Sequence, residues 1–208
     1  MTPYQPDELP LQNKKDWDWP ALVSAVGEAN AELARYDGLL QGIVNPSIML
    51  SPLTNQEAML SSKIEGTQAT VDEVLEYEAG IDKEAEKVND IYEIINYRKA
   101  LRDAHDSLSQ RPITLGVIRE LHKILLDSVR GRDKNPGQFR SDQNWIGRPG
   151  AKIEEATFIP PSPLQLQDYL EKWQIYVEGN DMDVLIQTAI IHAQFELIHP
   201  FRATFKII

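Results

Sequence analysis

The stretch MDVLIQTAIIHAQFELIHPF, residues 182–201, decides the fold. Its apolar residues cover nearly every face of a helix, which is typical of the central helix of a bundle. Pro200 should end this helix, because proline lacks the amide hydrogen of a helical residue and its ring clashes with the preceding turn. His199 is thereby released at the end of a buried helix, a place suited to chemistry.

The composition is that of an ordinary globular protein. The chain has 208 residues, of which 42% are hydrophobic and 25% charged, and its net charge is -11. This charge repels a phosphate backbone and argues against nucleic-acid binding. No apolar run is long enough to span a bilayer, and the polar N-terminus does not have the pattern of a signal peptide. We therefore expect a cytoplasmic protein without membrane partners; the absence of cysteine excludes disulfides and thiolate metal sites.

The remaining sequence is also largely helical in pattern. Apolar residues at a 3.6-residue period predict an amphipathic helix over residues 20–40. Asn45-Pro46 and Ser51-Pro52 are expected to break the chain after the first helix. Capping boxes at Thr54 and Thr70 then predict two short helices that end at Gly66 and Gly80. Further helices are expected over residues 88–108, from Thr114 to about 129, over residues 163–177, and from Asp181 or Asp183 onward.

The segment 131–163 is different, because its glycines and prolines exclude long helices. Residues 144–146 and 156–159 are predicted to pair as a small β-hairpin. The sequence therefore predicts an all-α helical bundle with an N-terminal helical extension and a hairpin. Pro112 marks the boundary between residues 1–111 and 112–208.

Five short motifs occur together and in order, and they carry a resemblance. The motifs are Ser61-Ser-Lys-Ile-Glu-Gly66, Asn135-Pro-Gly-Gln-Phe-Arg140, Gln143-Asn-Trp-Ile-Gly147, Phe158-Ile-Pro-Pro-Ser-Pro163 and Ile198-His-Pro-Phe201. With these motifs the chain resembles the Fic (Fic/DOC) family of protein adenylyltransferases, in the subgroup whose inhibitory helix precedes the Fic core. A Fic-like helical bundle is the fold that this resemblance implies.

The resemblance implies that AMP is transferred from ATP to a hydroxyl side chain of a target protein. In this reading His199 is the general base, and Phe201 anchors the loop in the core after Pro200 has ended the helix. An imidazole suits this role, since its unperturbed pKa of about 6.5 leaves it largely neutral near pH 7. ATP and Mg²⁺ are the implied substrate and cofactor.

The proline-rich hairpin corresponds to the family's flap, which holds an extended part of the target as an added strand. Ala156, Thr157, Phe158 and Ile159 would supply its edge. A target protein of unknown identity is thus the expected partner.

An inhibitory motif is implied within a helix over about residues 54–66. Ser61 and Glu65 are four residues apart and so share one helix face, and Gly66 ends the helix. By resemblance, Glu65 keeps ATP in a nonproductive pose. The three residues of this motif, with Pro200 and Phe201, are predicted to lie at the ATP site.

The sequence departs from the family after Phe201. The family continues with one variable residue, an acid that holds Mg²⁺, and then Gly-Asn-Gly-Arg, whereas this chain has Ala203 in the position of the acid. Alanine has no ligand for a metal, and Phe205 and Ile207 replace the flexible loop that would cradle phosphates. We therefore expect a chain truncated within the Fic loop, without a metal ligand and with little or no transferase activity.

Two other interpretations follow from the same residues. The chain could be a noncatalytic helical interaction module or a degenerate remnant. In either case the expected truncation removes neighbours of the last helix, so self-association is expected through an exposed apolar face near Ile190, Ile191 and Phe195. His192 and His199 with Glu196 superficially resemble a metal site, but the His-Glu-x-x-His pattern of zinc hydrolases is absent. No metal site is predicted.

Overall fold

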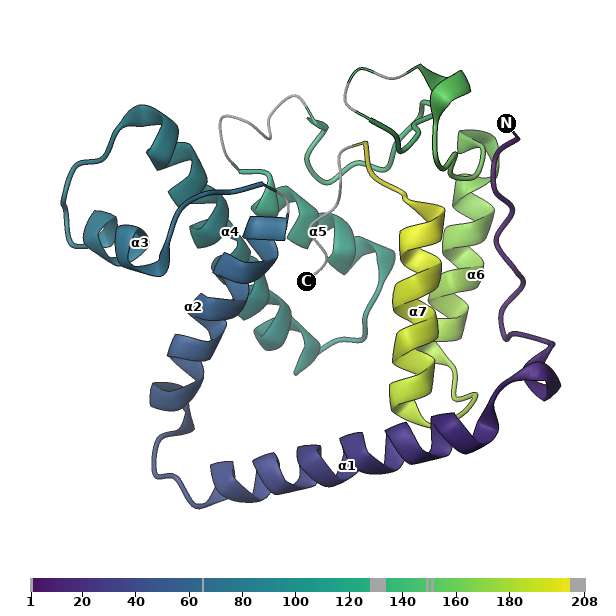
Figure 1. Ribbon diagram of the computed structural model, residues 1–208, viewed down its shortest axis with the longest axis horizontal. Helices are drawn as coiled ribbons and strands as arrows, with labels where there is room; N and C mark the ends of the chain where they lie inside the picture. The colour runs from purple at the N-terminus through teal and green to yellow at the C-terminus, as the bar shows by residue number, and fades with distance from the viewer. Residues whose placement is uncertain (1, 65, 128–133, 149, 151, 203–208) are drawn as a thin grey trace.

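The computed structural model describes residues 2–64, 66–127, 134–148, 150 and 152–202, and this part of the chain is mostly helical (Figure 1). It has no β-strand within those residues. The elements are η1 (Lys14–Asp16), α1 (Trp19–Gln41), α2 (Pro46–Ile64), α3 (Val71–Glu78), α4 (Ala85–Leu108), α5 (Leu115–Leu125), η3 (Ile153–Glu155), η4 (Pro163–Gln165), α6 (Leu166–Glu178) and α7 (Val184–Ile198). None of the described helices is both long and apolar enough to cross a membrane.

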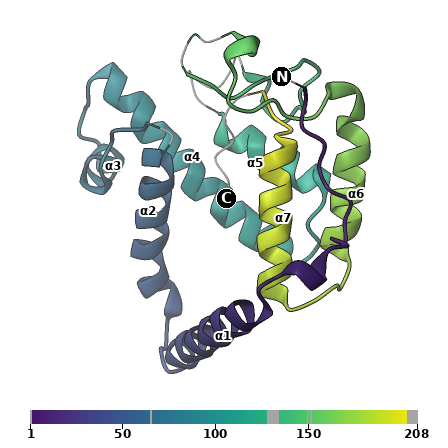
Figure 2. The same cartoon turned by 45° about the vertical axis from the view of Figure 1, so that its right-hand side comes forward.

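Helix α1 runs across one end of the molecule, from below α7 to below α2 (Figures 1 and 2). The glycine- and proline-rich loops lie at the opposite end. Both α2 and α7 point their C-terminal ends toward these loops, with α5 between them. The first residues of the chain run alongside α6.

One hydrophobic core forms where α2, α3 and α5 pack against α4. It contains Ala58 from α2 and Val74 from α3, which meet Ile91, Ile94 and Tyr97 of α4. These α4 residues recur at three-residue spacing, so they lie along one stripe of the helix.

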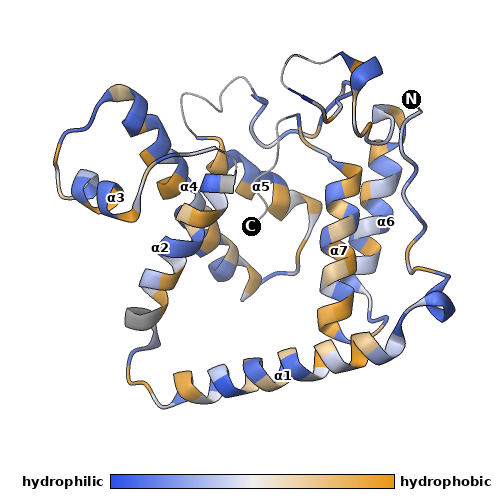
Figure 3. Ribbon diagram, viewed as in Figure 1, coloured by the Kyte–Doolittle hydropathy of each residue, from blue (hydrophilic) through white to orange (hydrophobic). Residues whose placement is uncertain are grey.

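A second core lies between α5, α6 and α7. Leu170 and Trp173 of α6 pack with Phe195 and Ile198 of α7, and Phe201 beyond the helix end joins them. Figure 3 shows that α7 is apolar over most of its length. The site residues of the C-terminal loop are therefore anchored in this second core.

The predicted helix boundaries are confirmed where caps define them. Thr70 forms a capping box at α3, in which its side chain and that of Glu73 each accept from the other's backbone N–H. Gly80 ends α3 at φ 87°, a left-handed conformation that glycine adopts without steric cost. Asp183, one of the two candidates, begins α7 by accepting a hydrogen bond from the N–H of Leu185 at 2.9 Å.

The expected start of the second helix was wrong. Helix α2 begins at Pro46, where the missing amide hydrogen costs nothing, and it continues through Pro52. Thr54 does not cap a helix; its hydroxyl donates to the carbonyl of Leu50, four residues earlier, as mid-helix threonines do. Packing of α2 along α4 offsets the hydrogen bond that Pro52 removes.

The predicted β-hairpin is not formed as a pair of strands, although its two segments lie next to each other. The two segments meet in a single antiparallel bridge between Ile146 and Phe158. The Ile146 N–H donates to the Phe158 carbonyl at 2.8 Å. The connecting residues then turn into η3 at Ile153–Glu155, so the ladder does not extend.

The expectation of an exposed apolar face on α7 was also wrong, because tertiary contacts cover this face. Ile190 and Phe195 are buried and Ile191 is half-buried. Trp173 of α6 packs against Phe195 and donates its indole N–H to the carbonyl of Ile191 at 2.8 Å.

Exposed apolar residues lie instead on α1. Val23, Leu33 and Leu39 are 67%, 53% and 64% exposed, and no residue of α1 is buried. Its first half shares a cleft of about 600 Å³ with α7, which Leu22 and Ala189 help to line. Self-association stays a prediction.

Gly137 fixes the loop before the site against α5. It has φ 74°, and an added Cβ would lie 3.0 Å from the carbonyl oxygen of Arg119 and 3.3 Å from Cβ of Lys123. Two hydrogen bonds hold it there: Arg119 Nε donates to its carbonyl, and its N–H donates to Nδ1 of His122, both at 2.8 Å. Its conformation and its surroundings both exclude a side chain.

The variant Gly137→Ala should therefore lose more stability than Gly80→Ala. At Gly80 the positive φ alone opposes a side chain, since nothing lies within 4 Å of an added Cβ, and the cost is about 1–2 kcal/mol. The clash at Gly137 should add roughly 1–3 kcal/mol. Urea denaturation followed by circular dichroism measures both; equal losses would show that the contact with α5 does not restrict this loop.

Candidate functional site

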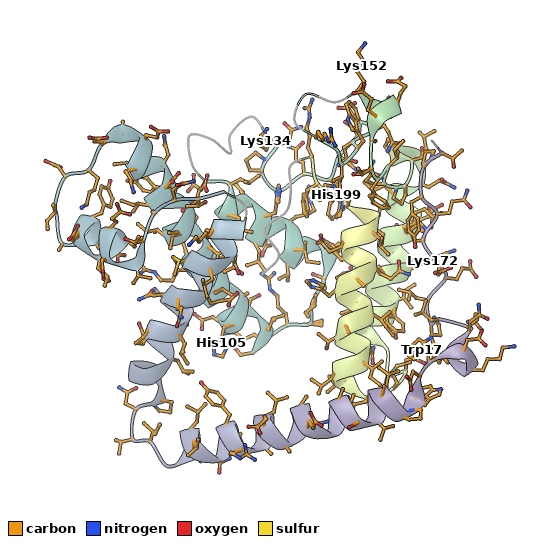
Figure 4. All side chains as sticks on the ribbon, in the orientation of Figure 1. Trp17, His105, Lys134, Lys152, Lys172 and His199 are labelled. Carbon is orange, nitrogen blue, oxygen red and sulfur yellow. The ribbon has the colours of Figure 1, made fainter. Side chains whose placement is uncertain are left out.

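His199 ends α7 in a left-handed backbone conformation. Its φ is 47° and its ψ 64°, and its N–H donates to the carbonyl of Phe195 at 3.0 Å. Positive φ is uncommon for residues other than glycine, although histidine is among the types that tolerate it. The turn places His199 at the edge of the loops (Figure 4). The proline that follows prevents the helix from continuing.

Arg140 holds the His199 turn in place by hydrogen bonds to backbone carbonyls. Its guanidinium donates to the carbonyls of Pro161 at 2.7 Å, His199 at 2.9 Å, and Ile198 and Asp142 at 3.3 Å. Its own N–H donates to the carbonyl of Pro200 at 2.8 Å. One side chain thus joins the end of α7 to the loop segments before and after the Ile146–Phe158 bridge.

The charge of Arg140 is balanced by carbonyl dipoles. The residue is 5% exposed, and burial lowers the pKa of its guanidinium to about 10, so it stays protonated at neutral pH. The carbonyls at the C-terminus of α7 carry the negative end of the helix dipole, which favours a cation there. Since four of its five N–H groups have carbonyl partners, Arg140 is a structural residue and not a free anion ligand.

The imidazole of His199 contacts the side chain of Asn144. Nδ2 of Asn144 lies 2.9 Å from Nδ1 of His199 and donates to the carbonyl of Phe201 at 3.1 Å. Burial lowers the pKa of His199, and the positive charge of Arg140 lowers it further. At neutral pH the ring is therefore neutral, as a proton acceptor must be.

Phe201 is fully buried and lies against His122 of α5. The two rings stack with centroids 3.7 Å apart and an interplanar angle of 10°, and Phe139 packs on Phe201 at 5.2 Å. His122 is 1% exposed, and burial lowers its pKa to about 4. Pro200 is buried too, and the carbonyls of both residues accept hydrogen bonds from within the chain, so neither residue presents a free surface to a nucleotide.

The predicted flap residues 156–159 differ in exposure, and the N-terminal segment lies beside them. Ala156 and Ile159 are buried, Phe158 is half-buried and Thr157 is exposed. The carbonyl of Ile159 accepts the N–H of Tyr4 at 2.8 Å, and the rings of Tyr4 and Phe158 lie 5.5 Å apart. The N-terminal segment therefore lies where an added strand would pair.

The inhibitory motif is only partly described. The hydroxyl of Ser61 donates to the carboxylate of Glu57 at 2.7 Å, one turn back on α2. Gly66 has φ 92°, and its N–H donates to Lys63 while that of the next residue donates to Ser62, which ends the helix as expected. Glu65 lies outside the described residues.

Sequence reasoning missed the supporting residues of His199. Arg140 and Asn144 belong to two of the recognised motifs, but their contacts span 55–59 positions and have no local signature. His122 lies on the buried face of α5 and was not singled out from the sequence. Its three-residue spacing from the buried Leu125 was the available signal.

The described residues do not fit a magnesium ion. Asn144 and Arg140 offer hydrogen-bond donors to the His199 turn, whereas Mg²⁺ requires oxygen ligands. No group of three His, Cys, Asp or Glu side chains gathers in the part of the chain that the structure covers. Ala203, in the position of the family's acid, lies outside it.

Two family models match this chain. The Fic/DOC family N-terminal model matches residues 23–106, and the Fic/DOC family model matches residues 112–203. Together they take in both cores and the His199 turn.

The fold is similar to that of solved structures, three of which serve as examples. A Fic family protein from Desulfovibrio desulfuricans G20 aligns over 96% of this chain and 55% of its own, with a TM-score of 0.71 and 22% identity. Fic-1 from C. elegans aligns over 88% of this chain and 54% of its own, with a TM-score of 0.62 and 21% identity. A Fic domain containing signaling protein from Bacteroides thetaiotaomicron aligns over 73% of this chain and 59% of its own, with a TM-score of 0.56 and 19% identity. The chain thus spans little more than half the length of each.

His122 should make stability depend on pH. Below about pH 6.5 the unfolded chain binds a proton at this imidazole, whereas the folded chain does so only near pH 4. Stability from His122 is therefore complete above pH 6.5 and falls as the pH drops toward 4, by about 3 kcal/mol. Urea denaturation between pH 4 and 7 should show the wild type losing stability faster than His122→Gln, which cannot titrate.

The matched control is His105→Gln, which changes an exposed histidine at the end of α4 and should follow the wild-type curve. Parallel curves for wild type and His122→Gln would contradict the burial of a neutral His122.

Proposed function

Because this chain carries both Fic/DOC domains and so belongs to that family, we propose that it derives from a protein adenylyltransferase that modifies a hydroxyl side chain of a target protein. The observation that carries this proposal is the His199 turn. A neutral imidazole ends α7, with its backbone held by Arg140 and the adjoining Phe201 buried in the second core. A turn fixed at these two points suits a catalytic loop.

His199 takes the role of general base in this proposal. The target hydroxyl loses its proton to the imidazole while its oxygen bonds to the α-phosphorus of ATP, and the bond from that phosphorus to pyrophosphate breaks. His199 leaves this step as the imidazolium. The low pKa of the ring favours the neutral form that can begin the cycle.

The flap and Glu65 supply target binding and restraint. We propose that the edge at Phe158 and Ile159 holds an extended target segment by backbone hydrogen bonds. Glu65, next to the left-handed turn at Gly66, restrains the nucleotide as in the subgroup that the motif resembles. A cytoplasmic location, where ATP is available, is part of the same proposal.

Ala203 sets a low expectation for activity. Without an acid at this position the sequence offers no Mg²⁺ ligand there, so transfer should be slow or absent even when Glu65 is removed. The same residue favours the second candidate function, a noncatalytic helical module that binds a partner. ATP labelled at its α-phosphate distinguishes the two.

Labelling by the Glu65→Gly variant should be small because Ala203 replaces the Mg²⁺ ligand, but any that occurs should exceed that of the wild type, because the restraint on the nucleotide is gone. Adding His199→Ala should lower the residual rate by roughly 10²–10⁴-fold, the usual contribution of a general base. Label is measured on denatured protein after incubation with ATP and Mg²⁺, so that bound nucleotide is not counted.

His192→Ala in the Glu65→Gly background is the matched control, since His192 is an exposed histidine on the same helix. Its label should equal that of Glu65→Gly. Incorporation that does not depend on His199 would refute its role as base, and no incorporation by any variant would favour the noncatalytic module.

A further inference from the structure

The side-chain amide of Asn144 makes two contacts from one end. Its Nδ2 atom lies 2.9 Å from Nδ1 of His199 and 3.1 Å from the carbonyl oxygen of Phe201. A carbonyl oxygen can only accept a hydrogen bond. The amide end near Phe201 must therefore be the NH₂ group, and its orientation is fixed by chemistry.

The orientation of Asn144 determines the tautomer of His199. The NH₂ group has two hydrogens, and one is directed to each neighbour. Nδ1 of His199 must then accept, and a neutral imidazole that accepts at Nδ1 carries its proton on Nε2. We infer that Asn144 is a positioning residue that holds His199 in the Nε2–H form.

This inference rests on the proposed function for its consequence. A general base needs a free nitrogen lone pair, yet here the lone pair at Nδ1 is occupied by Asn144 and Nε2 carries hydrogen. Proton transfer at Nε2 requires the amide to rotate, so that its oxygen accepts Nδ1–H and the lone pair moves to Nε2. Asn144 then separates a resting form of the site from an accepting form.

The other end of the amide supports a second orientation. Oδ1 of Asn144 is buried and has no hydrogen-bond partner among the residues that the structure describes, and such a group costs about 1–3 kcal/mol. Rotation would satisfy this oxygen with Nδ1–H of His199 but would turn it toward the carbonyl of Phe201, where two acceptors repel. Rotation would also take both hydrogens of the NH₂ group away from the acceptors they have now, so the observed orientation is the more stable one and the rotated one is reached only at a cost.

Nitrogen NMR on the full chain labelled with ¹⁵N-histidine tests the assignment directly, above the pH at which the imidazoles titrate. The chain has four histidines, and His199 is assigned by the signal that disappears in His199→Gln. His122 is the internal reference for the Nε2–H form, because its Nδ1 accepts the backbone N–H of Gly137 at 2.8 Å. Exposed His192 serves as the averaged reference.

Wild-type His199 should give the Nδ1 and Nε2 shifts of His122. In Asn144→Asp the carboxylate can only accept, so the proton should move to Nδ1 and the two shifts should exchange positions. In Asn144→Ala the shifts should approach those of His192. Circular dichroism shows whether each variant is folded, and the wild-type spectrum alone tests the assignment if a variant is not.

A wild-type spectrum of the Nδ1–H form, or one averaged like that of His192, would overturn the inference, as would unchanged shifts in folded Asn144→Asp. The measurement reads the resting ring and needs no AMP transfer. A correct tautomer without any labelling would therefore leave the inference standing and count only against the proposed function.

Discussion

The buried guanidinium of Arg140 is the interaction on which the site depends. Isolated charges are costly to remove from water, by several kcal/mol even after relaxation, and four carbonyl oxygens replace that water here. Those carbonyls come from the end of α7 and from the loops on either side of the flap. The loops and the helix end are therefore held in one arrangement, because any other would leave the cation without partners.

Around this cation the two cores divide the work of the fold. The first core gathers α2 and α3 on α4 and sets the direction in which α2 ends. The second core anchors Phe201, and through it the turn at His199. Helix α5 contributes Leu125 to the first core and His122 to the stack on Phe201. It is thus the element through which both halves are joined.

Much of the fold could be predicted from local signals. The helical period gave α1 to within a residue or two, and Thr70, Gly80 and Asp183 marked helix ends because caps act through neighbouring backbone groups. The start of α2 could not be predicted in this way. Packing on α4 overrides the break at Pro52, and no local pattern records that packing.

The site divides in the same way. His199 and the two segments that meet at the Ile146–Phe158 bridge were recognisable from the sequence, whereas the roles of Arg140 and Asn144 arise from contacts across more than 50 residues. The cover over α7 likewise comes from α6, with which it shares Trp173. Long-range contacts of this kind are set by the whole fold.

The hydrogen bond from Tyr4 to Ile159 has a consequence for any visiting peptide. The N-terminal segment is tethered, so it competes at an effective concentration that for short flexible connections reaches the millimolar range. Contacts farther along hold it in place, including the ion pair of Lys172 with Glu8 at 3.0 Å and the packing of Leu9 in the second core. An added peptide strand would therefore have to displace the N-terminal segment, and a short peptide that forms only backbone hydrogen bonds would not displace it.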